Sequence, residues 1–258
     1  MAEKATSGSD TRPEPAWFGD RPVDAAEKPG LVRGVFDSVA GRYDLMNDLM
    51  SGGVHRLWKR AMLDRLAPKK GEVFLDVAGG TGDIAFRILE RTEREAKVIV
   101  CDLTPAMLEV GRDRATDRGI LAGIEWVTGD AENLPFESAT MDGCTIAFGL
   151  RNVTHPDRAL AEMHRVLKPG GRFLCLEFSH VVLTGLRDLY DVYSRSMLPT
   201  LGALVARDRA SYEYLVESIR RFPTQEALAA MMREAGFDLV SFRNLSGGIA
   251  ALHAGWRT

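Results

Sequence analysis

The sequence lacks any hydrophobic run that approaches the roughly 18 residues needed to cross a membrane. Its first residues are polar and contain no apolar signal-peptide core. We therefore expect a cytoplasmic protein. If it handles a lipid, it must do so by peripheral contact with the inner face of the membrane, or from a partner protein.

Cysteines and clustered metal ligands are also scarce. The three cysteines, Cys101, Cys144 and Cys175, fall at or near predicted strands and form no CxxC pair. We expect buried, reduced thiols. The five histidines are scattered, and neither HExxH nor a Cys/His cluster is present. The sequence therefore predicts no metal site.

An excess of positive charge is missing too. The chain has 33 basic and 36 acidic residues, which gives a formal net charge of −3. This balance provides no bulk attraction to nucleic acid or anionic lipid, and no basic run is interleaved with aromatic residues. We expect no nucleic-acid partner.

What is present has the composition of one packed domain, with 258 residues of which 45% are hydrophobic and 27% charged. Residues 1–16 are rich in Ser, Thr, Pro and charge, so we expect a disordered tail. Residues 17–258 then form a single domain. Apolar residues at helical spacing start near Leu31 and recur from Val54 to Leu66, which predicts N-terminal helices within 31–66.

The middle of the chain predicts an α/β sheet. Five apolar runs, most of them separated by helical patterns, are typical of buried parallel strands: VFLDVAGGTGD, which stops in glycines, KVIVCD, IEWVTGD, MDGCTIAF and RFLCLEF. Two later runs, FDLVSFRN and ALHAGW, are joined by a glycine-containing loop and must pair antiparallel. We expect a mostly parallel sheet with helices on both faces and an antiparallel C-terminal strand.

A long connection at about 180–222 follows the fifth run. Its apolar residues, including Tyr193, have helical character. One interpretation is that it adds helices to the core. The other is that it forms a helical cap over a substrate, because long insertions at this edge of a sheet often line the site. In the second case Tyr193 is a candidate substrate contact.

A glycine-rich turn follows the first strand, in the segment from Asp76 to Asp83. Glycines allow the backbone to turn sharply and to approach a ligand closely. The spacing of Gly79, Gly80 and Gly82 matches neither GxGxxG nor a Walker loop, so a diphosphate site is disfavoured.

Acidic residues end the next two strands. Asp102 could accept hydrogen bonds from both hydroxyls of a ribose. Asp130 could accept from an adenine amine while the Ala131 amide donates to a ring nitrogen. Asp76 or Asp83 could bind the ammonium of an amino acid. Acids and a glycine turn suit a ligand with a ribose, an ammonium and a sulfonium cation.

This ordered set resembles the class I S-adenosylmethionine-dependent methyltransferases. The resemblance implies a Rossmann-like, seven-stranded sheet with an antiparallel last strand, and S-adenosyl-L-methionine as cofactor. It also implies contacts with the methionine end of the cofactor from Gly79, Gly80, Thr81 and Gly82. Asp102 would hold the ribose, and Asp130 with Ala131 the adenine.

Further motifs narrow the resemblance. They are RYDLMNDLMS at 42–51 with GGVHRLWK after it, FGLRNV at 148–153, RVLKPGGR at 165–172 with LEFS at 176–179, and SYEYLVESI at 211–219. Together they resemble the ubiquinone/menaquinone biosynthesis C-methyltransferase family. Ala147 is a departure, because that family often has a serine there that is taken to contact the cofactor; a backbone contact could remain.

The family resemblance implies C-methylation of a polyprenylated quinol. The acceptor would be a 2-methoxy-6-polyprenyl-1,4-benzoquinol, a demethylmenaquinol, or both. A deprotonated quinol hydroxyl makes the adjacent ring carbon nucleophilic, whereas an oxidised quinone is electron-poor. We therefore expect activity only on the reduced form, with a quinone-biosynthesis assembly as a candidate partner.

Arg151 and Asn152 follow the fourth strand and are the candidate catalytic residues. Arg151 could stabilise a phenolate or orient a water molecule, or it could form a salt bridge with a loop acid. Asn152 could bond a ring oxygen. Tyr43 and Asn47 are candidate substrate contacts that seal the site, with capping or packing as the alternative.

Two other functions fit the same pattern. One is methylation of another small molecule. The other is a non-catalytic member of a biosynthetic assembly that binds the cofactor or a lipid. The intact glycine turn and the Arg151–Asn152 pair argue against the second.

Overall fold

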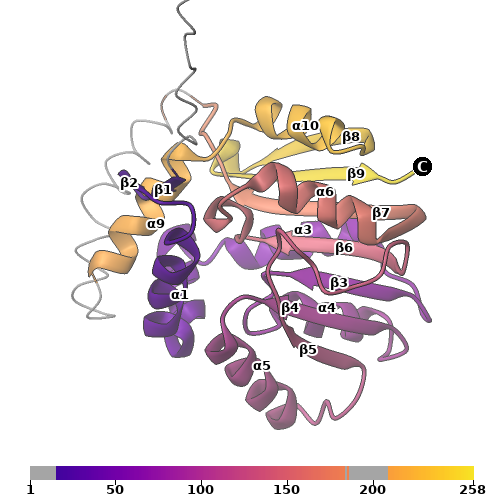
Figure 1. Cartoon of the computed structure of the whole chain (residues 1–258). Helices are drawn as coiled ribbons and strands as arrows, with labels where there is room; N and C mark the ends of the chain where they lie inside the picture. The colour runs from indigo at the N-terminus through magenta and orange to yellow at the C-terminus, as the bar shows by residue number, and fades with distance from the viewer. Residues whose placement is uncertain (1–15, 184, 186–208) are drawn as a thin grey trace, which may run out of the picture.

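A seven-stranded sheet forms the centre of the protein, whose computed structural model describes residues 16–183, 185 and 209–258 (Figure 1). The strand order is β5-β4-β3-β6-β7-β9-β8. The strands are β3 (Val73–Val77), β4 (Lys97–Asp102), β5 (Ile124–Thr128), β6 (Met141–Ala147), β7 (Leu167–Phe178), β8 (Asp238–Leu245) and β9 (Ala250–Trp256).

The first five of these strands pair in parallel, and β9 pairs antiparallel with both β7 and β8. The predicted mostly parallel sheet with an antiparallel C-terminal strand is therefore confirmed. The sheet is parallel because its strands are connected by crossover helices, and β8 and β9 can be antiparallel because a short turn joins them.

Two apolar cores cover the two faces of the sheet. One contains side chains of α3 (His55–Leu66), α4 (Asp83–Arg91) and α5 (Pro105–Asp117). The other contains side chains of α6 (Pro156–Val166) and α10 (Gln225–Glu234). Helices on both faces were predicted, and the packing confirms them.

Helix α10 shows how local sequence sets the ends of these helices. Thr224 is its N-cap, and the Thr224 side chain accepts a hydrogen bond from the Ala227 amide at 3.3 Å. Gly236, with a φ of +99°, follows the last turn in a conformation that favours glycine. Leu228, Ala229 and Met232 are buried at helical spacing.

The N-terminal segment contains elements that the sequence did not predict. A short hairpin of β1 (Ala16–Phe18) and β2 (Arg21–Val23) precedes the helices. Helix α1 (Lys28–Val39) begins before the expected Leu31, because Pro29 occupies its first turn, where no amide donor is needed. A 3-10 turn leads into α2 (Tyr43–Ser51).

Helix α9 (Arg209–Arg221) packs against this hairpin. Phe18 of β1 stacks on Tyr214 of α9, with ring centroids 4.3 Å apart. Figure 1 shows α1 and α9 beside each other beyond the carboxyl ends of the parallel strands. These elements therefore stand where the site was predicted.

Part of the predicted organisation falls outside the described residues. Residues 1–15 of the expected tail, and residues 184 and 186–208 of the expected cap, are in this part of the chain. Ala16, the last residue of the expected tail, belongs to β1. The described end of the cap segment includes α9.

All three cysteines are buried and free, as expected. Within residues 16–183, 185 and 209–258, no helix has both the length and the hydropathy needed to cross a membrane.

Candidate active site

The site lies where the strand order reverses. From β3 the chain continues outward to β4 and β5, and then returns to place β6 on the other side of β3. The loops after β3 and β6 diverge at this point, which leaves a crevice at the carboxyl edge of the sheet. The loops after β3, β4, β5 and β6 contribute residues to the pockets described below.

The turn after β3 has a backbone that requires glycine. Gly80 and Gly82 have φ values of +54° and +79°. A Cβ at Gly82 would lie 2.5 Å from the Trp126 ring, and a Cβ at Gly79 would lie 2.7 Å from Asp76 Oδ2. The turn is therefore close-packed against the strands, and it brings backbone amides to the crevice.

Asp102, at the end of β4, is tied to this turn. Its Oδ2 accepts from the Gly80 amide at 2.9 Å, and its Oδ1 accepts from the Thr104 amide at 2.8 Å. Burial raises the pKa of Asp102, and the bonds from Thr104 and Gly80 oppose that shift. Each oxygen keeps a lone pair for a ligand donor.

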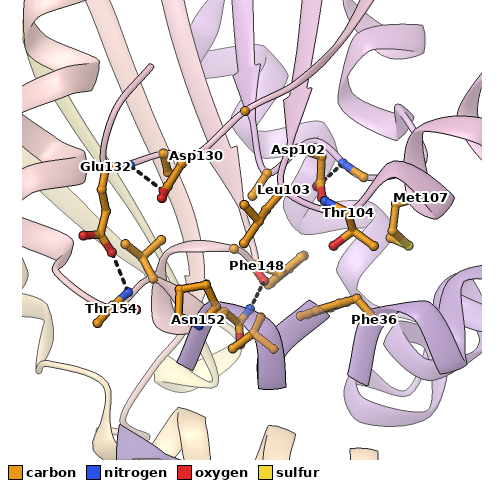
Figure 2. A pocket seen from close by; sticks show the side chains of 18 residues that line it. Phe36, Asp102, Leu103, Thr104, Met107, Asp130, Glu132, Phe148, Asn152 and Thr154 are labelled. Atoms are coloured by element: carbon orange, nitrogen blue, oxygen red, sulfur yellow. Dashed lines mark hydrogen bonds between the residues drawn. The ribbon is translucent and has the colours of Figure 1, made fainter. Parts of the chain in front are cut away.

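A pocket of about 720 Å³ extends from Asp102 to the loops after β5 and β6. Figure 2 shows Asp130 and Asp102 along one side, with Asn152 and Phe36 across from them. The lining residues include Pro29, Val32, Phe36, Ala78, Leu103, Met107, Ala131, Phe148 and Val153. An apolar pocket with a few polar groups suits a small organic ligand.

Asp130 lies in a braced loop. Its Oδ1 accepts from the Glu132 amide at 2.9 Å. Glu132 Oε1 in turn accepts from the amides of Thr154 and His155, each at 2.9 Å, and Figure 2 shows the bond from Thr154. The loop after β5 is therefore fastened to the loop after β6, and the wall formed by Asp130, Ala131 and Glu132 is held in place.

A smaller pocket lies on the other side of the glycine turn. Its lining contains Lys59, Asp76, Ala78, Gly79, Thr81, Asp83, Ile84 and Ala147. Ala78 lines both pockets, so the two adjoin at the turn.

Asp76 is the unusual group of the smaller pocket. Its Oδ1 accepts from the Thr145 hydroxyl at 2.7 Å, while its buried Oδ2 has no hydrogen-bond partner among the described residues. Burial raises the pKa of Asp76 to about 7. Burial would also raise the pKa of Asp83, but Lys59 and Arg87 lower it to about 2.

Arg151 and Asn152 stand on one turn but face different surroundings. The Arg151 side chain is 0% exposed, and its Nη1 donates to Glu177 Oε1 and to the Phe148 carbonyl, both at 2.6 Å. Asn152 lines the large pocket, and its Oδ1 accepts from the Tyr214 hydroxyl at 3.0 Å. A salt bridge between Arg151 and an acid in a loop was one of the alternatives that the sequence left open. Arg151 does form a salt bridge, but its partner Glu177 lies on β7.

The remaining predicted residues are placed as follows. Ala147 lines the smaller pocket, and Thr81 accepts a hydrogen bond from Arg114 at 2.6 Å. Asn47 is fully buried in α2, and neither of its amide atoms has a partner in the part of the chain that the structure describes. Tyr43 begins α2. Tyr193 lies outside the described residues.

Three residues of the site were missed by the sequence reasoning: Lys59, Glu132 and Glu177. Lys59 and Glu177 lie in motifs that carried the family resemblance, but no role was assigned to either. Glu132 follows Asp130 closely and could have been suspected from that position alone.

The residues present fit S-adenosylmethionine better than a dinucleotide. Asp76 Oδ2, which no described residue contacts by a hydrogen bond, can accept from an ammonium group, and Asp102 can accept from ribose hydroxyls. The turn is too crowded for any side chain at Gly79 or Gly82. Carboxyl groups on both sides of the turn would repel a diphosphate.

The fold and site together define a Rossmann-like methyltransferase. Among solved structures, the chain resembles the [4+2]-cyclase SpnF (TM-score 0.67, 17% identity, 89% of this chain and 96% of that chain). It also resembles a possible histamine N-methyltransferase of Thermotoga maritima (TM-score 0.63, 20% identity, 88% of this chain and 100% of that chain). At such identities these likenesses show the fold alone.

Residues 23–257 match the model of the ubiE/COQ5 methyltransferase family, and the chain belongs to this family. A ubiquinone/menaquinone biosynthesis C-methyltransferase of Brucella anthropi is 57% identical over 242 residues, or 93% of this chain and 92% of that protein. The Paracoccus denitrificans protein of the same name is 58% identical over 245 residues, or 95% of this chain and 98% of that protein. The family resemblance is confirmed.

Proposed function

We propose that this chain transfers a methyl group from S-adenosyl-L-methionine to a ring carbon of a polyprenylated quinol in ubiquinone or menaquinone biosynthesis. The acceptor is 2-methoxy-6-polyprenyl-1,4-benzoquinol, demethylmenaquinol, or both. The observation that carries the cofactor assignment is the pair of adjoining pockets around one glycine turn. The names of the relatives that match nearly the whole chain support the acceptor.

In this proposal the two pockets divide the cofactor between them. Asp102 accepts from the ribose hydroxyls, and Asp130 with the Ala131 amide binds the adenine in the large pocket. Asp76 accepts from the ammonium in the small pocket. The amides of Gly79, Gly80, Thr81 and Gly82, with the backbone of Ala147, contact the methionine part.

When bound, the cofactor supplies an electrophilic methyl group. The acceptor carbon must carry electron density and must approach that methyl group in line. A quinol oxygen that has lost its proton provides this density, and loss of the ring proton afterwards restores aromaticity. The Asn152 amide, which faces the large pocket, holds a ring oxygen in position.

Arg151 acts through the turn on which Asn152 stands. Its Nη1 donates to Glu177 and to the Phe148 carbonyl, whereas its Nε and Nη2 have no hydrogen-bond partner among the described residues. The Arg151 amide lies 3.3 Å from Glu177 Oε2. These bonds fix residues 148–152, where Phe148 has a φ of +60°. We therefore propose that Arg151 also acts as a positioning residue, while its expected contact with a phenolate or a water molecule stays a prediction.

A hollow of about 630 Å³ provides space for the acceptor beyond Asn152. It shares Val153 and Thr154 with the large pocket, and its lining includes Arg151, Trp17, Tyr214 and Phe222. The buried Asn47 amide, with no partner among the described residues, supports a polar contact from α2. Tyr43 and Tyr193 complete the proposed substrate contacts.

A polyprenyl tail partitions into lipid, so the enzyme must meet its acceptor at a bilayer or on a partner. We propose peripheral contact with the inner face of the membrane, or docking in a quinone-biosynthesis assembly. The exposed Val182 and Leu183, which follow β7, support such a contact. Flotation of the protein with phospholipid vesicles that contain a polyprenyl quinol tests it.

The function is tested by transfer of a labelled methyl group to both acceptors, each supplied reduced and oxidised. We expect transfer to at least one quinol and to neither quinone. Transfer to neither quinol, with cofactor binding intact, would favour a different small-molecule acceptor or a non-catalytic role.

A further inference from the structure

Lys59 is a buried cation with no role in the function proposed so far. It lies on α3, is 4% exposed, and lines the small pocket beside Asp76. Lysines are seldom buried unless their charge is used. Lys59 also belongs to the segment GGVHRLWK, which precedes β3.

The charge of Lys59 is only partly used by its neighbour. Its Nζ donates to Asp83 Oδ2 at 2.8 Å, and an ammonium group has three donors. Asp83 has a second cation, because Arg87 Nε lies 3.1 Å from Asp83 Oδ1. Two cations therefore share one carboxylate at the edge of the pocket.

The small pocket thus contains two chemically different groups. Asp76 Oδ2, which has no hydrogen-bond partner among the described residues, is an acceptor, and the Lys59 ammonium is a donor. The end of an amino acid carries one ammonium and one carboxylate. A pocket that contained carboxyl groups alone would accommodate the first and repel the second.

We propose that Lys59 binds the α-carboxylate of the methionine part of the cofactor while Asp76 accepts from its ammonium. This inference rests on the proposed function, because it assumes that S-adenosylmethionine occupies the two pockets. It gives α3 a binding role, since a residue of this helix, which precedes β3 in the sequence, would then recognise the amino-acid end of the ligand.

A purely structural role is the competing explanation. In that case Lys59 only links α3 to α4 through Asp83, and it would affect all ligands to the same extent. A ligand that lacks only the carboxylate separates the two explanations. Decarboxylated S-adenosylmethionine keeps the adenosine, the sulfonium and the ammonium, and it is the more cationic ligand. A pocket in which only acidic residues contacted the ligand would therefore bind the decarboxylated compound more tightly than S-adenosylmethionine.

The test is calorimetric titration of the full chain with both ligands. We expect the wild type to bind S-adenosylmethionine more tightly than the decarboxylated compound. Lys59→Met keeps the aliphatic stem and removes the charge. The substitution should lower the affinity for S-adenosylmethionine on the order of tenfold to a hundredfold, as for a lost charge-assisted hydrogen bond. The affinity for the decarboxylated compound should fall by less than about threefold.

Arg87→Met is the matched control, because it removes the other cation that contacts Asp83 from outside the pocket. It should leave the ratio of the two affinities unchanged. Thermal unfolding of each variant checks that the fold is retained.

Equal weakening of both ligands by Lys59→Met would overturn the proposal, as would no weakening of either. If Lys59→Met does not fold, the wild-type affinities still test the proposal, because equal affinity for the two ligands contradicts a carboxylate contact. Failure of the wild type to bind either ligand would instead refute the proposed function.

Discussion

At the scale of single residues, the acids around the glycine turn differ because their surroundings differ. Asp102 has two backbone donors, whereas Asp76 has one hydroxyl donor and a second oxygen with no hydrogen-bond partner among the described residues. Burial dominates at Asp76 and raises its pKa to about 7. An acid that is half protonated near neutrality can change its charge when a cationic ligand arrives.

Asp76 should make the stability of the ligand-free protein depend on pH. The folded state keeps its proton up to about pH 7, whereas an unfolded aspartate loses its proton near pH 4. The stability from this group is therefore full below about pH 4 and is lost as the pH rises through about 7. Asp76→Asn removes the titration.

Urea denaturation of the wild type and of Asp76→Asn between about pH 4 and 8 measures this pH dependence of stability. The free energy of unfolding of the wild type should fall relative to that of Asp76→Asn by a few kcal/mol, on the order expected for such a shift. A difference that stays constant with pH would contradict the protonated Asp76.

Asp102 should dominate cofactor affinity. Asp102→Asn leaves an acceptor for the Thr104 amide but places an NH₂ group where the Gly80 amide and a ribose hydroxyl donate. We expect the affinity for S-adenosylhomocysteine to fall on the order of a hundredfold. Asp117→Asn, on the exposed end of α5, is the control. Unchanged affinity in Asp102→Asn would exclude the assigned ribose contact.

At the scale of elements, turns and their supports position the site. The turn after β3 depends on glycine, and the turn after β6 depends on a buried ion pair between Arg151 and Glu177. Burial raises the pKa of Glu177 while Arg151 opposes that shift. The pair joins the 148–152 turn to β7, so it holds Asn152 relative to the sheet.

Gly82→Ala should destabilise the protein by about 2 kcal/mol or more. The φ of +79° costs an L-residue roughly 1–2 kcal/mol, and the new Cβ would lie 2.5 Å from the Trp126 ring. Gly34→Ala in α1, where a Cβ meets nothing within 4 Å, should instead be neutral or stabilising by up to about 1 kcal/mol. Chemical denaturation of both variants compares them, and equal effects would argue against a crowded turn.

Arg151→Met should cost about 3–5 kcal/mol, because it leaves Glu177 buried without its cation. The double variant with Glu177→Leu should regain most of that stability. It should not regain turnover, because the turn is then no longer fixed by hydrogen bonds. Full recovery of turnover in the double variant would show that the pair has no positioning role.

At the scale of the whole molecule, the sheet could be predicted because its strands are apolar throughout and end in glycines or acids. The antiparallel C-terminal strand could be predicted because a short loop permits no crossover. The hairpin β1–β2 could not, since strands of three residues carry too little periodicity to be recognised.

The candidate site was predictable only in part. Acidic residues at strand ends, such as Asp102 and Asp130, are positioned by the sheet itself, and both line the large pocket. The buried pairing of Arg151 with Glu177 could not be deduced from local pattern, because the two residues are distant in sequence. Lys59 was missed for the same reason.

The most direct test of the central proposal is the fate of a ¹³C-labelled methyl group after one turnover with a reduced, prenylated acceptor. We expect the nuclear magnetic resonance spectrum of the product to show a methyl group bonded to a ring carbon, and no product from the oxidised acceptor. A labelled methoxy group, or equal transfer to the oxidised acceptor, would contradict C-methylation of a quinol.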